Sequence, residues 1–344
     1  MPSSQRSRAT GRVTLADVAQ AAGVSPITAS RALRGTRSVD EAMAQRVHDA
    51  ARQLGYVPDP AARALASARS HHVAVLIPLL SNNLFVDLLE AAQRCLQPAG
   101  FQMLIGVTHY QPAEEEALLR SYLAHRPAGL MVTGFDRTPE AHRLIETSGV
   151  PCIHLMELGA PDLNEEAPYS VGLSQREAGY ALTQHLLAQG RRRVAFVGAQ
   201  LDPRVLQRLD GYRQALAEAG LHDPTLECLS PLPSSLALGD QLMQQVLQAH
   251  PDVDALFFCN DDLAQGGLLA ALRLGIPVPQ RLSVAGFNDL AGSAQWVPPL
   301  TTVRTPRAAI GEQAAQMLLR LMHGEPVPRR QVDVGFELMV RGSS

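Results

Sequence analysis

Residues 13–33, VTLADVAQAAGVSPITASRAL, predict two short helices joined by a tight turn. Thr14 and Asp17 form a T-x-x-D capping pattern, so we expect Thr14 to cap the first helix. Gly23 follows this helix and supplies the turn, because glycine adopts the left-handed backbone at little cost. The spacing is therefore typical of a helix-turn-helix.

The second helix is expected to present a small, polar and cationic surface. Ser25 caps it, and Pro26 occupies its first position, where the missing N–H costs nothing. The side chains expected on its exposed face are Ile27, Thr28, Ser30, Arg31 and Arg34. Such a surface suits the major groove of DNA, with the positive helix N-terminus near the phosphate backbone. Two capped helices around a glycine also occur in any helical hairpin, so this pattern alone favours DNA binding only modestly.

The sequence that follows indicates a three-helix headpiece. Ser38 and Glu41 form an S-x-x-E capping box that opens a third helix, and Gly55 stops it. A very short helix containing Arg63 and Leu65 is then expected before a linker rich in Ser and Arg. An exposed leucine on an isolated two-turn helix is hard to explain as core, whereas an apolar wedge in the minor groove of DNA explains it directly.

With these motifs the chain resembles the lactose-repressor (LacI/GalR) family of bacterial transcription regulators over essentially its whole length. The supporting strings are V-T-L-x-D-V-A-x-x-A-G-V-S at 13–25, T-x-S-R at 28–31, L-G-Y-V-P at 54–58 and A-x-x-L-A at 62–66. An ordered set of this kind is far more specific than one motif. The chain departs from the family at Pro26 and Ile27, where larger polar residues are usual, so its operator sequence cannot be read from the resemblance.

The resemblance implies roles for individual residues of the headpiece. Pro26, Ile27 and Arg31 would read bases in the major groove. Thr28, Ser30 and Arg34 would approach phosphates, with Leu65 as the wedge of a hinge helix. The complete set of DNA contacts that we expect is Thr14, Ser25, Pro26, Ile27, Thr28, Ser30, Arg31, Arg34, Arg63 and Leu65.

Charge is unevenly distributed along the 344 residues. Residues 1–72 carry a balance of +5 and the remainder −8, so the basic end can approach DNA while the acidic part discourages nonspecific coating. The organisation that we predict is a disordered tail at 1–12, a helix-turn-helix headpiece at 13–58, a hinge helix and linker at 59–71, and a two-lobed effector-binding and dimerisation domain at 72–344.

From residue 73 onward, apolar strands alternate with amphipathic helices. Strands separated by ten to fifteen helical residues require right-handed crossovers and parallel sheets, so we expect an α/β fold of two doubly wound lobes. A closing strand is expected near residues 332–340. The resemblance implies a periplasmic-binding-protein-like pair of lobes with three crossovers, usually assembled as a homodimer.

Ligands of open parallel sheets bind beyond the carboxyl ends of the strands, and two facing lobes bring these ends to one cleft. The effector-binding residues expected there are Ser81, Asn82, Phe85, Glu157, Arg204, Arg208, Asn260 and Asn288. Taken singly, turn chemistry explains a loop Asn better and solvation explains a surface Arg better. The resemblance favours the cleft, because Arg208, Asn260 and Asn288 fall on positions that the family uses for effectors.

Two of these positions narrow the effector. Sugar-binding relatives usually place Asp where Asn288 stands, and Arg204 stands one helical turn before Arg208. A carboxylate ligand would gain two charge-assisted partners and lose one repulsion. We therefore expect a small polyhydroxy acid, and the strings S-N-N-x-F, L-M-E, L-D-x-R and V-D-V-G-F resemble the gluconate-repressor branch of the family. A regulator that responds to 2-ketogluconate is the near alternative, ahead of one that responds to a neutral sugar.

Two other classes of protein fit less well. A periplasmic sugar-binding protein needs a signal peptide, and the N-terminus MPSSQRSRATGR lacks an apolar region, so we expect a cytoplasmic protein. An enzyme needs a catalytic motif, and none of the common ones is present, so we expect neither activity nor a cofactor. Disulfides and a metal are not expected either, because the four cysteines have no C-x-x-C spacing. No apolar run suits a membrane, and no C-terminal leucine heptad indicates more than a homodimer.

Overall fold

The computed structural model describes residues 13–35, 39–57, 70–80, 84–159 and 167–344. The chain divides into two compact units, residues 1–70 and 71–344. The predicted tail at 1–12 and most of the predicted hinge lie outside the described residues, and so do Ser38, Arg63, Leu65, Ser81 and Asn82. The predicted domain boundaries at residues 58 and 71 stay predictions.

The headpiece consists of three helices around a small core. Its helices are α1 (Leu15–Ala22), α2 (Pro26–Leu33) and α3 (Glu41–Leu54). The predicted capping box is present: the Asp17 N–H donates to Thr14 Oγ1, and the Thr14 N–H donates to the Asp17 carboxylate at 2.7 Å. Gly23 ends α1 in the left-handed conformation with φ 65°. The side chains buried between the helices are Val18, Ala19, Ala22, Ala29, Ala32, Val47, Ala50 and Ala51.

The start of the third helix differs from the prediction. Asp40 caps α3, and its carboxylate accepts the Met43 N–H at 3.3 Å. The expectation that Ser38 caps this helix is therefore wrong, because Asp40 stands directly before the first helical residue and places its carboxylate on the free N–H groups. Gly55 ends the helix with φ 63°, as predicted.

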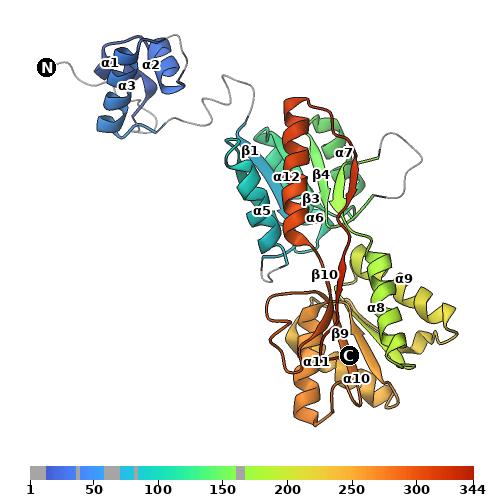
Figure 1. Ribbon diagram of the computed structural model, residues 1–344. Coiled ribbons are helices and arrows are strands. Elements are labelled where there is room, and N and C mark those ends of the chain that lie inside the picture. Colours follow the sequence, from blue (N-terminus) through green and yellow to red (C-terminus); the bar gives the residue numbers. More distant parts are fainter. Residues whose placement is uncertain (1–12, 36–38, 58–69, 81–83, 160–166) are drawn as a thin grey trace. The chain divides into compact units, whose positions relative to one another are not determined.

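The second unit contains two six-stranded sheets, one in each lobe (Figure 1). The first lobe begins with β1 (His72–Ile77), α5 (Val86–Leu96), β2 (Gln102–Val107), α6 (Pro112–Ala124), β3 (Gly129–Thr133), α7 (Pro139–Ser148), β4 (Cys152–Leu155) and β5 (Ser170–Gly172). The second lobe comprises α8 (Gln175–Ala188), β6 (Val194–Ala199), α9 (Pro203–Glu218), η1 (Pro224–Leu226), β7 (Glu227–Ser230), α10 (Leu236–Ala249), β8 (Ala255–Phe258), α11 (Asp261–Leu274), β9 (Ser283–Asn288) and β10 (Thr301–Arg304).

Three final elements link the lobes: α12 (Arg307–His323), β11 (Gln331–Asp333) and β12 (Glu337–Met339). The sheet orders are β11-β5-β4-β3-β1-β2 and β12-β10-β9-β8-β6-β7. The chain thus crosses between the lobes after β5, after β10 and between β11 and β12, and Figure 1 shows α12 beside α5 in the first lobe. This architecture confirms the predicted fold class of a helical headpiece with two doubly wound lobes.

The closing strand differs from the prediction. Two short strands, β11 and β12, replace the single strand expected near residues 332–340, and they belong to different sheets. β12 pairs antiparallel with β10, whereas the other strand pairs are parallel. The antiparallel pairing follows from the direction of the chain, because β10 runs from the second lobe toward the first and β12 runs back beside it.

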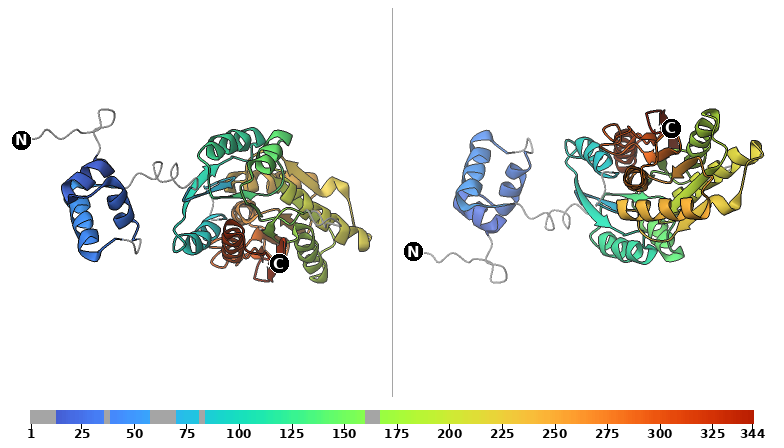
Figure 2. Two further views of the ribbon diagram at one scale, coloured as in Figure 1. Left: turned by 90° about the horizontal axis from the view of Figure 1, so that it is seen from above. Right: turned by 90° about the horizontal axis from the view of Figure 1, so that it is seen from below.

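Alternating side chains of each strand supply a core on both faces of the sheet. In β1, Val73, Val75 and Ile77 join the core that includes α5 and α12, whereas Ala74 and Leu76 join the core beneath α6 and α7. Each sheet is consequently covered by helices on both faces, as the two views of Figure 2 show. This layering leaves the loops at the strand ends free to form a binding site.

Helices α8 and α9 approach each other backbone to backbone. A Cβ at Gly211 of α9 would lie 2.0 Å from the Arg176 carbonyl oxygen, and one at Gly179 of α8 would lie 2.4 Å from the Arg208 carbonyl oxygen. Only glycine fits at such a distance, so these two residues fix the position of α9 and of the side chains that it carries.

Gly211→Ala should therefore destabilise the protein, because backbone atoms cannot yield to the added methyl group. We expect the free energy of unfolding to fall by at least about 1–3 kcal/mol, the usual cost of overpacking. Urea denaturation of the full chain measures it. Asp210→Ala, at an exposed neighbouring position, is the control. Equal stability of the two variants would contradict the close approach of α8 and α9.

Candidate functional site

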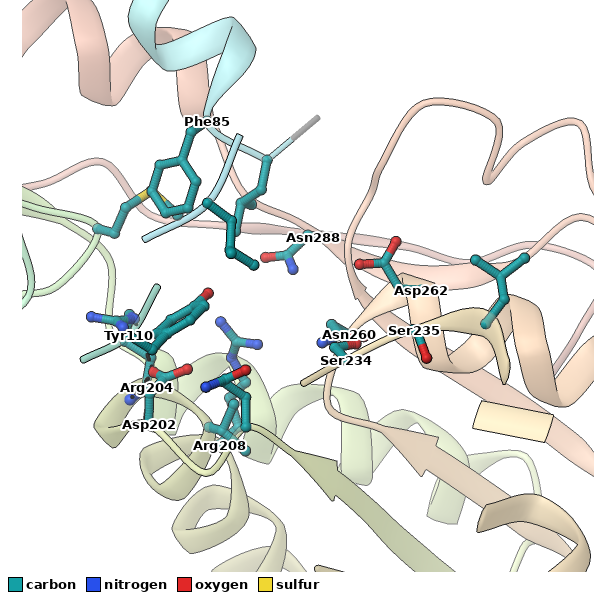
Figure 3. Close-up of a pocket in the computed structure, with 16 residues that line it drawn as sticks. Phe85, Tyr110, Asp202, Arg204, Arg208, Ser234, Ser235, Asn260, Asp262 and Asn288 are labelled. Carbon is teal, nitrogen blue, oxygen red and sulfur yellow. Dashed lines mark hydrogen bonds and ion pairs between the residues drawn. The ribbon is translucent and has the colours of Figure 1, made fainter. Parts of the chain in front are cut away.

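A pocket of about 270 Å³ lies between the two lobes, at the carboxyl ends of their strands. The predicted effector residues that line it are Phe85, Arg204, Arg208, Asn260 and Asn288. Figure 3 shows these side chains around one space, with residues of the first lobe facing those of the second. The structure thus brings together five of the eight predicted residues.

Arg208 of α9 is buried in the pocket wall, with 5% of its surface exposed. Its Nε donates to Gln175 Oε1 at 2.8 Å, its Nη1 donates to the Cys259 carbonyl at 2.6 Å, and its guanidinium lies 3.8 Å from the centre of the Phe287 ring. Burial lowers the pKa of Arg208, the nearby Asp202 carboxylate partly counteracts this effect, and the side chain stays charged at neutral pH. A guanidinium has five N–H donors, so three are left over.

No carboxylate of the described residues forms an ion pair with Arg208. A buried cation without a counter-charge is costly, and proteins usually pair such a group or bind an anion to it. The leftover donors of Arg208 therefore suit an anionic ligand. In Figure 3 its guanidinium points into the pocket.

Arg204, one turn earlier on α9, has a different environment. Its Nε lies 3.0 Å from Asp202 Oδ1, and its Nη1 lies 3.6 Å from Asp136 Oδ1 and 3.7 Å from Glu157 Oε2. Burial opposes the charge of Arg204, but these three carboxylates raise its pKa above the ordinary value. Because Asp136 and Glu157 belong to the first lobe, Arg204 forms a charged contact between the lobes.

Glu157 does not line the pocket, in contrast to the prediction. It is 5% exposed, and its carboxylate accepts a hydrogen bond from the Gln207 side chain of α9. Burial raises the pKa of Glu157, while the neighbouring Arg204 counteracts this effect. Glu157 therefore belongs to the charged cluster that connects the lobes. We call this cluster, Arg204 with Asp136, Glu157 and Asp202, the Arg204 contact.

Two asparagines direct amide groups to the other side of the pocket (Figure 3). Asn260 caps α11, and its Oδ1 accepts from the Leu263 N–H at 3.1 Å and from the Ser234 hydroxyl at 2.9 Å. Asn288 has φ 110°, and its Oδ1 accepts from the Thr305 hydroxyl at 3.3 Å. In the described part of the chain, neither NH₂ group has a hydrogen-bond partner, so both are available as donors to a ligand.

Sequence reasoning missed several residues that line the pocket, among them Tyr110, Asp202, Ser234, Ser235 and Asp262. Tyr110 follows the end of β2 by three residues, so the rule that ligands sit beyond strand ends points to it. Asp202 and Ser235 are helix caps, and the sequence signals of capping concealed their position at the pocket. Only the assembled lobes show that these loops meet.

The exposed face of α2 matches the surface predicted for DNA contact. Ile27 is 66% exposed, and Ser25, Pro26, Arg31 and Arg34 are exposed as well. Thr28 and Ser30 are partly buried; the Thr28 N–H donates to the Ser25 hydroxyl, and Arg34 Nε donates to the Ser30 carbonyl. Thr14 donates its hydroxyl to Asp17 at 2.8 Å, so its side chain serves the capping box.

The cysteines, the groups that could bind a metal and the apolar helices of the described residues complete the description of the site. The cysteines Cys95, Cys152, Cys228 and Cys259 are free thiols. The described part holds no group of three or more His, Cys, Asp or Glu side chains arranged for a metal ion. Among the described helices, none is long and apolar enough to cross a membrane.

Arg204→Ala should destabilise the protein by about 3 kcal/mol, because removal of one partner leaves buried carboxylates without a cation. Addition of Glu157→Gln should restore part of the loss, since it removes one of the repelling charges. Thermal and urea unfolding of the full chain measure both effects. Arg143→Ala, which breaks a surface pair with Glu140, is the control. A loss no larger than that of the control would show that the Arg204 contact does not hold the lobes together.

Comparison with known proteins agrees with this geometry. Residues 14–59 match the family described as "Bacterial regulatory proteins, lacI family", and residues 183–344 match a periplasmic binding protein-like domain. The transcriptional regulator GntR of Pseudomonas aeruginosa is 57% identical over 99% of this chain and 98% of its own length.

Solved structures agree as well. The transcription regulator GntR of Chromobacterium violaceum is 48% identical, with a TM-score of 0.76 over 79% of this chain and 99% of that one. The lac repressor dimer bound to operator and the anti-inducer ONPF is 24% identical, with a TM-score of 0.83 over 96% of this chain and 99% of that one, and shares the fold. These relatives are transcription regulators and not enzymes. The chain belongs to the LacI family of bacterial regulatory proteins and is a DNA-binding transcriptional regulator.

Proposed function

We propose that this regulator is a repressor of sugar-acid metabolism. It binds a pseudopalindromic operator as a homodimer, and a small polyhydroxy acid such as gluconate releases it. The observation that carries the proposal is the buried guanidinium of Arg208, which faces the pocket without an ion pair among the described residues. A regulator of the same family that responds to 2-ketogluconate is the alternative, and a neutral-sugar repressor is a weaker one.

The donors of the pocket favour an acid over a neutral sugar. Arg208 offers unused N–H groups, and the amide groups of Asn260 and Asn288 add two more donors. Charge-assisted hydrogen bonds from a guanidinium to a carboxylate are about twice as strong as neutral ones. Sugar-binding relatives usually carry Asp at the position of Asn288. The neutral amide of Asn288 does not repel the carboxylate of an acid as that Asp would. The carboxylate of the effector would therefore bind Arg208, with its hydroxyl groups toward the asparagines.

The headpiece supports the proposed contact with an operator. The exposed α2 surface around Ile27 and Arg31 has the size and charge of a recognition helix. One headpiece reads one half-site, so two-fold symmetry of the protein requires a DNA site with matching symmetry. The lac repressor, which shares this fold, binds its operator as a dimer.

The proposed coupling between effector and operator follows from the two lobes. An effector that contacts both lobes stabilises one arrangement of them, and it shifts the dimer toward that arrangement if its affinity differs between the two states. We propose that the effector-bound arrangement is the one with low affinity for the operator. Coupling of about 1–3 kcal/mol would change operator affinity by about 5- to 150-fold.

Arg31→Ala should weaken binding to an operator selected by the wild-type protein from random double-stranded DNA. The expected loss is about 1–3 kcal/mol, the usual cost of one arginine contact to a base. Gel-shift titration at one salt concentration measures it. Arg46→Ala removes the same charge at an exposed position of α3 and should weaken operator binding less.

The selected operator also tests the homodimer. Selection of an asymmetric single half-site would argue against it.

Arg208→Ala should keep operator binding but lose release by gluconate, because the anion no longer finds a fixed cation in the pocket. Arg208→Lys should recover only part of the response, since an ammonium group cannot present two parallel donors. Operator affinity with and without gluconate, together with the melting temperature, tests both variants. Arg94→Ala, at an exposed position outside the pocket, is the control. A folded Arg208→Ala protein that gluconate still releases normally would rule out this effector site.

A further inference from the structure

Tyr110 is a pocket residue whose hydroxyl group has no assigned role. It lies in the loop between β2 and α6 of the first lobe, with φ 56°, a backbone conformation that residues other than glycine seldom adopt. Its ring packs beside Arg204, with 5.9 Å between the ring centre and the guanidinium carbon. Such strained positions cluster at functional sites, where the surrounding structure holds them in place.

The hydroxyl of Tyr110 faces the interior of the pocket, toward the same space as the guanidinium of Arg208 (Figure 3). Among the described residues it has no hydrogen-bond partner. Burial raises the pKa of Tyr110, and the nearby Asp202 raises it further. The hydroxyl therefore stays protonated at neutral pH and is able to donate to a ligand.

The charges of the neighbouring groups decide what this donor binds. Arg204 lies 3.0 Å from the Asp202 carboxylate and also near two carboxylates of the first lobe, so its charge is already offset. Arg208, in contrast, has no ion pair in the described part of the chain. A carboxylate has two oxygens and accepts up to about four hydrogen bonds, so it can take one from a guanidinium and one from a phenol together.

We infer that Tyr110 is the second recognition group for the carboxylate of the effector. Arg208 donates to it from the second lobe, and the Tyr110 hydroxyl donates to it from the first. The anion then connects the two lobes directly, which a neutral polyol does less well because its hydroxyl groups carry no charge. This inference rests on the proposed function, and it assigns acid selectivity to a pair of residues in place of Arg208 alone.

Tyr110→Phe tests the inference, because it removes one oxygen and keeps the ring beside Arg204. Calorimetry of the full chain should show gluconate binding weakened by about tenfold or more, as expected for the loss of a hydrogen bond to a charged group. Binding of glucitol, which has a CH₂OH group in place of the carboxylate, should change less. Tyr122→Phe is the matched control, since its hydroxyl donates to the Ile105 carbonyl at 3.0 Å, outside the residues that line the pocket.

Several results would overturn the inference. Gluconate binding by Tyr110→Phe at the strength of the Tyr122→Phe control, with binding lost in Arg208→Ala, would remove Tyr110 from the site and leave the proposed function intact. An equal loss for gluconate and glucitol would show that Tyr110 contacts the hydroxyl chain and not the carboxylate. Failure of the wild-type protein to bind gluconate or 2-ketogluconate would overturn the proposed function and this inference together.

Discussion

A buried guanidinium that forms no ion pair among the described residues is the constraint on which the proposed effector site depends. Arg208 is held by the side chain of Gln175, by the carbonyl of Cys259 and by the face of the Phe287 ring. None of these three partners carries a charge, and the nearby Asp202 offsets only part of the electrostatic cost of burial. The close approach of α8 and α9 at Gly211 fixes the backbone that carries this side chain. The packing of the second lobe thus holds in place the guanidinium that we propose binds an anion.

Two arginines one helical turn apart differ in function because their surroundings differ. Arg204 lies within 3.7 Å of three carboxylates and joins the lobes. Arg208 forms no ion pair among the described residues and faces the pocket. The first contact joins the lobes in this structure, and we propose that the second makes their arrangement sensitive to an acid. A ligand shifts the equilibrium between two arrangements of the lobes only if its affinity for them differs.

Local signals in the sequence predicted most of the fold, and contacts between distant residues account for what it missed. The capping box at Thr14 and the alternation of strands and helices act over a few residues, so both were predicted correctly. The cap of α3 was misplaced by two residues, because Ser38 and Asp40 are both good capping residues. The partner of Arg204 at Asp136 lies far away in sequence, and Tyr110 reaches the pocket only when the lobes assemble. No periodicity or motif encodes such pairings, although the position of Tyr110 just beyond the end of β2 is where ligands of parallel sheets bind.

A crystal structure of the full chain with gluconate would show whether Arg208 binds the acid. We expect the gluconate carboxylate within hydrogen-bond distance of the unused Arg208 donors, with Arg208 still bound to Gln175 and to the Cys259 carbonyl. The hydroxyl groups of the ligand are expected near Asn260 and Asn288. A gluconate whose carboxylate lies on the asparagine side, with Arg208 making no contact to the ligand, would contradict this expectation.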